Sequence, residues 1–141
     1  MRLTNFSDYA LRMLMYAAVH GSELITIEET AERYRISRTH LMKVANMLTN
    51  SGYLTAVRGR SGGLRLAMRP NQIGLGDIVR ATEPDFDLVE CFAKDGSCRV
   101  TPNCRLRGVL GEALSAFIST FDRYPLAALL LSTADFGLET A

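Results

Sequence analysis

The hydrophobic pattern of this 141-residue chain changes its period near Gly52, and this change constrains the fold more than any other feature. Before Gly52, apolar residues recur every three or four positions in two short runs, residues 25–34 and 37–51, with a break at Arg35 and Ile36. Such spacing predicts two short helices joined by a tight turn. After Gly52, residues 53–57 and 64–67 are strand-forming in character, which predicts a β-hairpin.

Local signals support the helix pair. Thr26 and Glu29 have the spacing of a capping box, in which each side chain satisfies a free backbone N–H of the other residue. Ser37 is a candidate N-cap for the second helix, and Ala31 is small enough to let the two helices cross closely. The apolar face of the second helix consists of Leu41, Val44, Ala45 and Leu48. This combination is typical of a helix-turn-helix.

The turn between the two predicted strands is both flexible and basic. Residues 58–63 include three glycines and two arginines, and Pro70 ends the strand pattern. Glycine supports the tight turns that join antiparallel strands. A basic hairpin that follows a helix-turn-helix is typical of a winged helix, in which the hairpin is the wing.

The other segments complete a mainly α fold with a small β-hairpin wing. Residues 6–19 predict a first helix, capped by Thr4 or Asn5, and residues 73–82 predict a further short helix. Residues 83–104 carry two prolines and all three cysteines and predict a loop. A long helix is expected from Arg105, with an apolar stripe comprising Leu106, Val109, Leu110, Ala113, Leu114, Phe117, Ile118 and Phe121.

This apolar stripe needs a partner surface. A second copy of the chain is the partner we expect, which predicts a homodimer; folding back onto the chain's own winged region is the alternative. We therefore expect three segments. They are a winged helix-turn-helix DNA-binding domain (1–82), a cysteine-bearing loop (83–104), and a dimerisation helix with a C-terminal tail (105–141).

Charge is distributed unevenly along the chain. No acidic residue occurs between Arg33 and Arg69, whereas the sequence from Asn71 onward has six basic and ten acidic residues, a net charge of −4. A basic block favours binding to a polyanion, although a solvated charged face is the alternative. The apolar runs are too short to span a membrane. No signal peptide, hydrolytic constellation or phosphate-binding loop is visible, which predicts a cytoplasmic protein that is not an enzyme.

The candidate DNA-contacting residues follow from this fold. In a helix-turn-helix, side chains at the start of the second helix reach base edges in the major groove. Here they are Ser37, Arg38, Thr39, His40 and Lys43, although a solvent-facing histidine without a role is an equal alternative for His40. The wing contributes candidates for the minor groove or the phosphates, namely Arg58, Arg60, Ser61, Gly62 and Arg65. The expected partner is a double-stranded DNA operator.

The three cysteines predict metal or redox chemistry. Cys91, Cys98 and Cys104 are separated by six and five residues, whereas zinc sites normally use ligand pairs two to four residues apart. Thiolates spaced along a loop suit an iron–sulfur cluster better, because the loop can surround a larger cofactor. A thiol–disulfide switch and inert thiols are the alternatives.

Several motifs together resemble the winged-helix iron–sulfur transcriptional regulators, the family that includes IscR, NsrR and RirA. They are residues 1–11 (MRLTNFSDYAL), 36–44 (ISRTHLMKV), 57–66 (VRGRSGGLRL) and the three-cysteine loop. The resemblance covers residues 1 to about 130. It implies a homodimer that binds an iron–sulfur cluster and controls genes according to the state of the cluster.

The fourth cluster ligand separates the branches of this family. The IscR type uses a histidine shortly after the third cysteine, but here Arg107 lies in that region and no histidine follows His40. The nitric-oxide-sensing NsrR type uses an aspartate of the partner's first helix, which Asp8 resembles. Residues 78–84 and 98–106 are also NsrR-like. The resemblance therefore implies metal ligands Cys91, Cys98, Cys104 and Asp8.

Three functional hypotheses follow from these patterns. The first is a repressor that senses nitric oxide through a four-iron cluster (4Fe–4S), which we favour over a two-iron cluster (2Fe–2S). The second is an iron-responsive regulator of the RirA type. The third, an iron–sulfur electron-transfer or scaffold protein, does not explain the basic wing. Asp8 also has a simpler explanation, because a carboxylate in the first turn of a helix is stabilised by the helix dipole.

Overall fold

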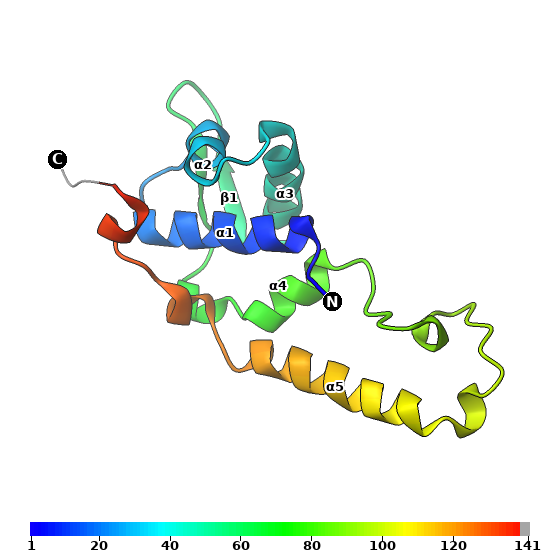
Figure 1. The fold of residues 1–141 in the computed structure, drawn as a ribbon. Helices are drawn as coiled ribbons and strands as arrows, with labels where there is room; N and C mark the ends of the chain where they lie inside the picture. The colour runs from blue at the N-terminus through cyan, green and yellow to red at the C-terminus, as the bar shows by residue number, and fades with distance from the viewer. Residues whose placement is uncertain (139–141) are drawn as a thin grey trace.

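The computed structural model describes residues 1–138 and is mainly helical with one two-stranded antiparallel sheet (Figure 1). The first predicted helix is confirmed, and so are the helix pair, the hairpin and the long helix. The predicted C-terminal segment ends with residues 139–141, which lie outside the described residues. The main elements are α1 (Asn5–His20), α2 (Ile27–Tyr34), α3 (Arg38–Asn50), β1 (Leu54–Val57), β2 (Gly63–Leu66), α4 (Leu75–Thr82) and α5 (Arg105–Asp122).

Caps at the helix ends follow the sequence signals in α1 and α2 but not in α3. Thr4 caps α1 by accepting a hydrogen bond from the Ser7 amide (3.3 Å). The capping box between Thr26 and Glu29 is formed at the start of α2. Arg35 ends α2 in the left-handed region (φ 54°), which reverses the chain direction before α3 begins.

The hydrophobic core surrounds α1, which packs against α3, α4 and β2. Met13 and Leu14 of α1 are fully buried, and the predicted inward face of α3 is buried as well. Leu75 and Ile78 bring α4 into the same core. The helix pair of residues 27–50 is therefore held on a rigid base that α1 and α4 provide.

The wing hairpin is attached to the helix pair by one additional bridge. Leu54 pairs with Leu66 and Val57 with Gly63, and Ile25 exchanges two backbone hydrogen bonds with Leu64, each 2.8 Å long. The turn needs glycine, because a Cβ atom at position 62 would lie 2.3 Å from the Val57 carbonyl oxygen. The wing is thus fixed at its base next to the start of α2.

The C-terminal tail returns to the winged region after α5 (Figure 1). The Leu126 amide donates to the Ile73 carbonyl at 2.7 Å, and the Leu126 side chain is fully buried. This pairing keeps Ile73 and Gly74 extended, so α4 begins at Leu75 rather than at the predicted Ile73. Farther along, Phe136 packs edge-on against Tyr16 and Tyr34 in an aromatic cluster.

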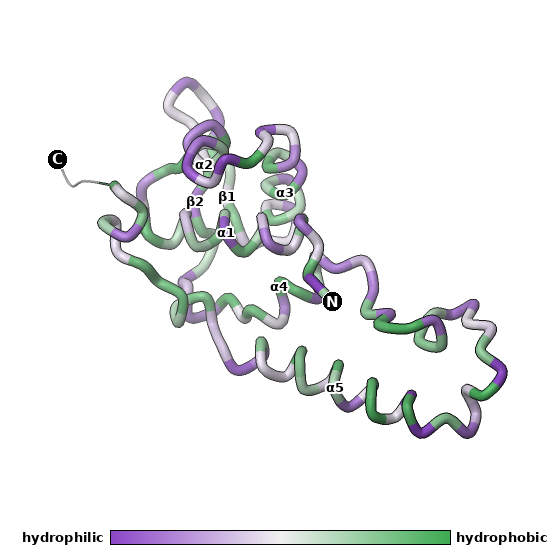
Figure 2. Tube along the Cα trace, in the orientation of Figure 1, coloured by the Kyte–Doolittle hydropathy of each residue, from purple (hydrophilic) through white to green (hydrophobic). Residues whose placement is uncertain are grey.

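Helix α5 and the loop of residues 83–104, here called the cysteine loop, project from the winged body as an arm (Figure 1). The end of α5 is anchored by a bidentate ion pair between Arg80 and Asp122 (2.6 and 2.7 Å). No residue of α5 is fully buried, and hydrophobic residues recur along its length (Figure 2). Among the described residues, none of the helices combines the length and apolar character that a membrane crossing requires.

Candidate nucleic-acid interface and cysteine loop

The predicted DNA-contacting residues lie on two neighbouring elements of the winged body, the first turns of α3 and the wing. Nine of the ten are solvent-exposed, and Gly62 is half-buried inside the turn. The start of α3 and the wing turn also border a common hollow of about 280 Å³, lined by Arg38, Met42 and Gly62 among others. The two predicted sets of residues therefore lie on one continuous surface.

The start of α3 is left without a side-chain cap. Ser37 occupies the N-cap position as predicted, but its side chain makes no capping hydrogen bond, so this prediction is wrong in its chemistry. The first N–H groups of a helix have no partner inside the helix, and such a terminus attracts anions. Helix α2, by contrast, has a complete capping box. The residues of the first turn of α3 are exposed, so a phosphate oxygen can approach their uncapped N–H groups.

Helix α1 connects to α3 through a contact that the sequence analysis missed. The rings of Tyr9 and His40 stack with their centroids 6.3 Å apart and their planes 29° apart. His40 is solvent-exposed, and its ring also contacts α1 through Tyr9. Because Tyr9 and His40 are 31 positions apart and belong to different helices, no local pattern indicates the contact.

Asp8, the predicted fourth metal ligand, pairs with Arg12 one turn along α1. Arg12 donates to both carboxylate oxygens at 2.9 and 2.8 Å. The guanidinium also lies 5.7 Å from the centre of the Tyr34 ring, and the Tyr34 hydroxyl donates to the Arg12 carbonyl at 3.1 Å. The i, i+4 spacing was the available sequence signal for the ion pair. Asp8 is therefore linked through Arg12 to the end of α2.

The three cysteines are distributed along the cysteine loop and the start of α5. Cys98 is exposed, Cys91 and Cys104 are half-buried, and all three thiols are free. Glu90 accepts hydrogen bonds from the amide and hydroxyl of Ser97, which closes the turn between the first two cysteines and lowers the pKa of Glu90. The chemistry of three thiols on one loop fits an iron–sulfur cluster.

The structure does not bring the predicted ligands together. Within residues 1–138, no three His, Cys, Asp or Glu side chains are placed to hold one metal ion. Asp8 belongs to α1 in the winged body, whereas the cysteines belong to the arm (Figure 1). In the described chain, a site containing all four ligands therefore requires movement of the loop, a second copy of the chain, or both.

Glu83 joins the cysteine loop to the first turn of α1. Its Oε1 atom accepts hydrogen bonds from the Thr4 amide (2.8 Å), the Thr4 hydroxyl (3.0 Å) and the Ser7 hydroxyl. Glu83 directly precedes Pro84 at the start of the loop, and Ser7 directly precedes Asp8. The sequence analysis missed this residue because its partners lie more than 70 positions away.

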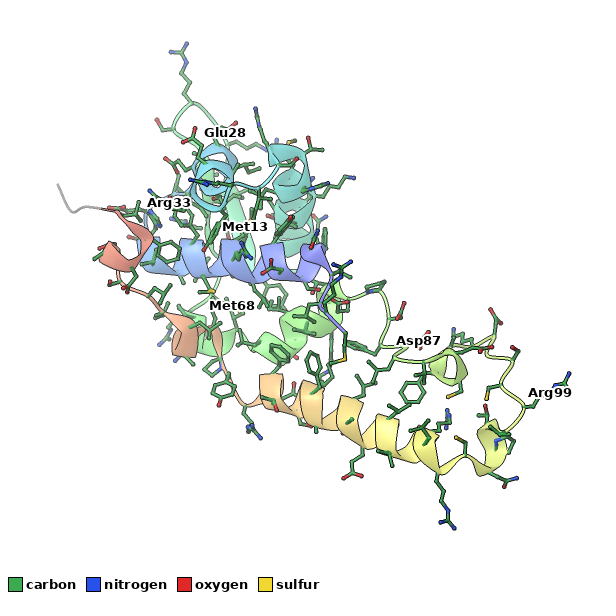
Figure 3. All side chains as sticks on the ribbon, viewed as in Figure 1. Met13, Glu28, Arg33, Met68, Asp87 and Arg99 are labelled. Atoms are coloured by element: carbon green, nitrogen blue, oxygen red, sulfur yellow. The ribbon has the colours of Figure 1, made fainter. Side chains whose placement is uncertain are left out.

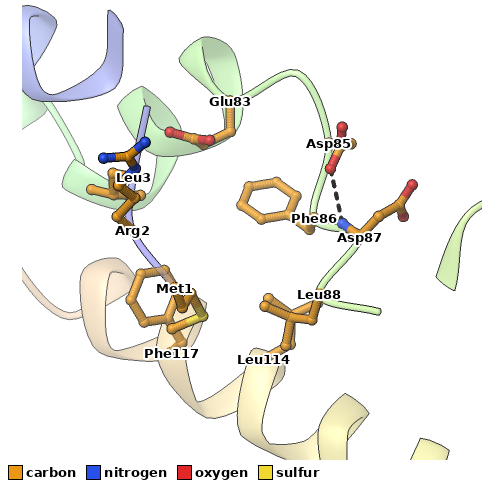
Figure 4. Close-up of a pocket in the computed structure, with 10 residues that line it drawn as sticks. All are labelled: Met1, Arg2, Leu3, Glu83, Asp85, Phe86, Asp87, Leu88, Leu114 and Phe117. Atoms are coloured by element: carbon orange, nitrogen blue, oxygen red, sulfur yellow. Dashed lines mark hydrogen bonds between the residues drawn. The ribbon is translucent and has the colours of Figure 1, made fainter. Parts of the chain in front are cut away.

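A cavity of about 310 Å³ lies beside Glu83 (Figure 4). It is lined by residues 1–3 at the N-terminus, by the cysteine loop and by α5. Its walls combine apolar and charged residues, and Phe86 and Leu88 of the loop face Leu114 and Phe117 of α5 across it. The Asp87 amide donates to Asp85 (3.0 Å), which holds the loop in a tight turn at the rim. The cavity lies at the root of the arm.

Comparison with known proteins gives this fold a family. The profile of the Rrf2 family, described as iron-dependent transcriptional regulators, matches residues 3–131. The chain belongs to the Rrf2 family. The regulator NsrR of Bacillus subtilis is 47% identical over 96% of this chain and 94% of its own length, and NsrR of Geobacillus kaustophilus is 48% identical over 92% and 90%.

Solved structures show the same fold for this Rrf2 protein. CymR of B. subtilis, described as its global cysteine regulator, superposes with a TM-score of 0.74 at 23% identity over 92% of this chain and 95% of its own. IscR of T. potens gives a TM-score of 0.73 at 23% identity over 92% and 85%. The predicted winged-helix fold and the predicted family are thus confirmed, and this Rrf2 protein is a DNA-binding transcriptional regulator.

Proposed function

We propose that this Rrf2 protein is a homodimeric repressor whose binding to DNA depends on an iron–sulfur cluster and responds to nitric oxide. The observation that carries the proposal is its 41–48% identity, over nearly the whole chain, to four regulators named NsrR. The similarity spans the recognition helix, the wing and the cysteine loop together. The chain resembles the nitric-oxide-sensing branch of the family in the same segments.

The DNA-binding part of the proposal uses α3 and the wing. Arg38, Thr39 and Lys43 project from the first two turns of α3 and are available for base edges in a major groove. Arg58 and Arg60 extend from the wing turn towards phosphates or the adjacent minor groove. The uncapped start of α3 adds backbone donors for a phosphate.

The dimer part of the proposal uses the apolar stripe of α5. Leu106 and Val109 are 62% and 61% exposed, which is unusual for large apolar residues spaced along one helix face. Apolar stripes of this kind are buried when a second helix packs against them. A second copy would also bring its own α1 and Asp8 to the assembly, and within residues 1–138 of one chain no three potential ligands are placed to hold a metal ion.

The residues that hold the cluster in this proposal are Cys91, Cys98, Cys104 and, from the second copy, Asp8. When bound, the cluster supplies iron to which nitric oxide can bind. Four ligands can hold either a two-iron or a four-iron cluster, and we favour the four-iron cluster. A carboxylate is a harder ligand than a thiolate, so Asp8 would be the ligand that an incoming molecule displaces most easily.

The chain's own contacts connect Asp8 to the DNA-binding surface. In the single chain Arg12 holds the Asp8 carboxylate and also contacts Tyr34 of α2. The neighbouring Tyr9 stacks on His40 of α3. A change in the partner of Asp8 therefore acts on a helix that contacts both helices of the helix-turn-helix. A bias of a few kcal/mol between two placements of α3 is enough to switch DNA occupancy strongly.

The test is anaerobic purification, followed by optical and Mössbauer spectroscopy before and after addition of nitric oxide. DNA affinity is measured in parallel for the cluster-loaded, cluster-free and nitric-oxide-treated protein. We expect tight, selective DNA binding only with the intact cluster. Cys98→Ser should abolish stable cluster binding, whereas Lys94→Ala, an exposed change in the same loop, should leave the spectrum unchanged.

The outcomes separate the candidate functions. Equal DNA affinity with and without the cluster would contradict cluster-dependent switching. Loss of DNA binding on iron depletion but no response to nitric oxide would favour an iron-responsive regulator, which the family description as iron-dependent also supports. A Cys98→Ser variant that still binds a full complement of cluster would exclude Cys98 as a ligand.

A further inference from the structure

An ion pair joins the two helices of the helix-turn-helix at the surface that the proposed function assigns to DNA. Glu28 in the first turn of α2 accepts from the guanidinium of Arg38, the first residue of α3, at 2.8 Å. The two side chains are 55% and 65% exposed. Within residues 1–138, it is the only ion pair between α2 and α3.

The helix dipole favours a carboxylate at Glu28, but neither helix cap requires its pairing with Arg38. The neighbouring Glu29 already completes the cap of α2, so Glu28 is not required for capping. Arg38 lies at the positive end of the α3 dipole, which is the unfavourable end for a cation. An exposed ion pair of this kind also contributes little to the stability of the fold. The position of Glu28 is therefore better explained by its effect on the placement of the Arg38 side chain.

The surroundings place the pair between the recognition helix and the wing. Glu28 and Arg38 line the 280 Å³ hollow together with Met42, one turn farther along α3, and Gly62 of the wing turn. Figure 3 shows Glu28 on the side of the molecule where the wing turn lies. Glu28 thus puts a negative charge at the edge of a surface that otherwise carries the acid-free stretch of residues 33–69.

We propose that Glu28 is a specificity-determining residue that positions Arg38 for one base edge and weakens binding to DNA in general. A free arginine side chain reaches the nearest phosphate on any sequence, whereas one held by a carboxylate loses less freedom when it contacts a guanine through two hydrogen bonds. The carboxylate charge also opposes the sequence-independent attraction of phosphates. Both effects raise the ratio of specific to non-specific affinity.

This inference rests on the proposed DNA-binding function, and its test uses the full-length, cluster-loaded protein. A preferred duplex is first selected from a random library with the wild type. Dissociation constants are then measured for that duplex and a scrambled one at several salt concentrations. The variants are Glu28→Gln, Arg38→Ala, the double substitution and Glu32→Gln. Glu32 is an exposed acid of the same helix that forms no pair with Arg38, so its variant removes the same charge without releasing Arg38.

Glu28→Gln should bind the scrambled duplex more tightly and lower the ratio of specific to non-specific affinity by about fivefold or more, the lower range for one bidentate base contact. Glu32→Gln should change both affinities together and leave the ratio unchanged. In the Arg38→Ala background, Glu28→Gln should have no further effect on the ratio. Thermal unfolding should be unaffected in all four variants, because the pair is exposed.

Two results would overturn the inference. One is a ratio for Glu28→Gln equal to that for Glu32→Gln, and the other is an effect of Glu28→Gln that persists without Arg38. Both leave the proposed function standing, because the wild type still prefers its selected duplex. A wild type with no preference for any duplex would instead contradict the proposed function, and this inference with it.

Discussion

At the scale of single residues, Tyr34 shows how packing changes chemistry. Burial at the end of α2 raises the pKa of its hydroxyl to about 12, despite the opposing charge of Arg12. The hydroxyl donates to the Arg12 carbonyl, and the ring contacts Tyr16 and Phe136. The folded state therefore disfavours the phenolate that the unfolded chain forms more easily.

The pKa of Tyr34 predicts a loss of stability in alkali. A pKa raised in the folded state gives a contribution that is fully present below the unfolded value near 10 and is lost as pH rises towards about 12. The free energy of unfolding, measured by urea denaturation across this range, should fall as the pH rises. Tyr34→Phe should show a shallower fall, although Tyr16 and Tyr53, whose pKa values are also raised, leave part of it. Identical pH profiles for the variant and wild type would contradict the assignment.

Residues whose partners lie close in sequence were predictable, and residues with distant partners were not. The capping box of Thr26 and Glu29 acts within one turn, so its spacing alone indicates it. The contacts of Glu83 with Thr4 and of Tyr9 with His40 depend on how α1 docks in three dimensions. Local periodicity carries no information about that docking.

At the scale of secondary-structure elements, the C-terminal tail is part of the winged body. Leu126 is fully buried in the core and Phe136 is 9% exposed. The sequence pattern predicts α1, α3 and the wing because each has its own periodicity. It gives no sign that Phe136 of the tail contacts both α1 and α2, because residues 123–138 contain only short 3-10 helices.

This packing predicts that Phe136→Ala destabilises the whole winged body. Removing a buried phenylalanine ring costs roughly 3–5 kcal/mol of unfolding free energy in well-packed cores, and we expect the lower part of that range near the chain end. Urea denaturation followed by circular dichroism measures the loss. Leu130→Ala, in the same tail but 49% exposed, serves as the control and should cost much less. Equal losses of unfolding free energy for the two variants would mean that the aromatic cluster does not stabilise the winged body.

At the scale of the whole molecule, contacts within one chain explain the arm of α5 and the cysteine loop less well than any other part. The stripe residues Leu106 and Val109 are exposed, whereas Phe121 packs against the core. Within residues 1–138, the three thiols are not placed to hold one metal ion. The sequence predicts the helix and the positions of the cysteines along the chain, but it does not predict how the thiols are arranged in space. Under the proposed function, that arrangement depends on a second copy of the chain.

The whole-molecule prediction is that a charge in the stripe separates the dimer. Val109→Glu should give a monomer by light scattering at concentrations where the wild type is a dimer, because a carboxylate buried in an apolar interface costs several kcal/mol. Ser115→Glu, on the polar side of α5, should remain dimeric. Circular dichroism should show unchanged helix content in both variants. A dimeric Val109→Glu protein would place the interface elsewhere.

The packing of the tail on the winged body also determines when the core can be completed as the chain is synthesised. Residues 1–82 leave the ribosome first, but Tyr16 and Tyr34 lack their aromatic partner until Phe136 has been made. The aromatic cluster therefore closes only after α5, which precedes Phe136 in the chain, has been synthesised. A fully packed winged body is thus never made without the arm.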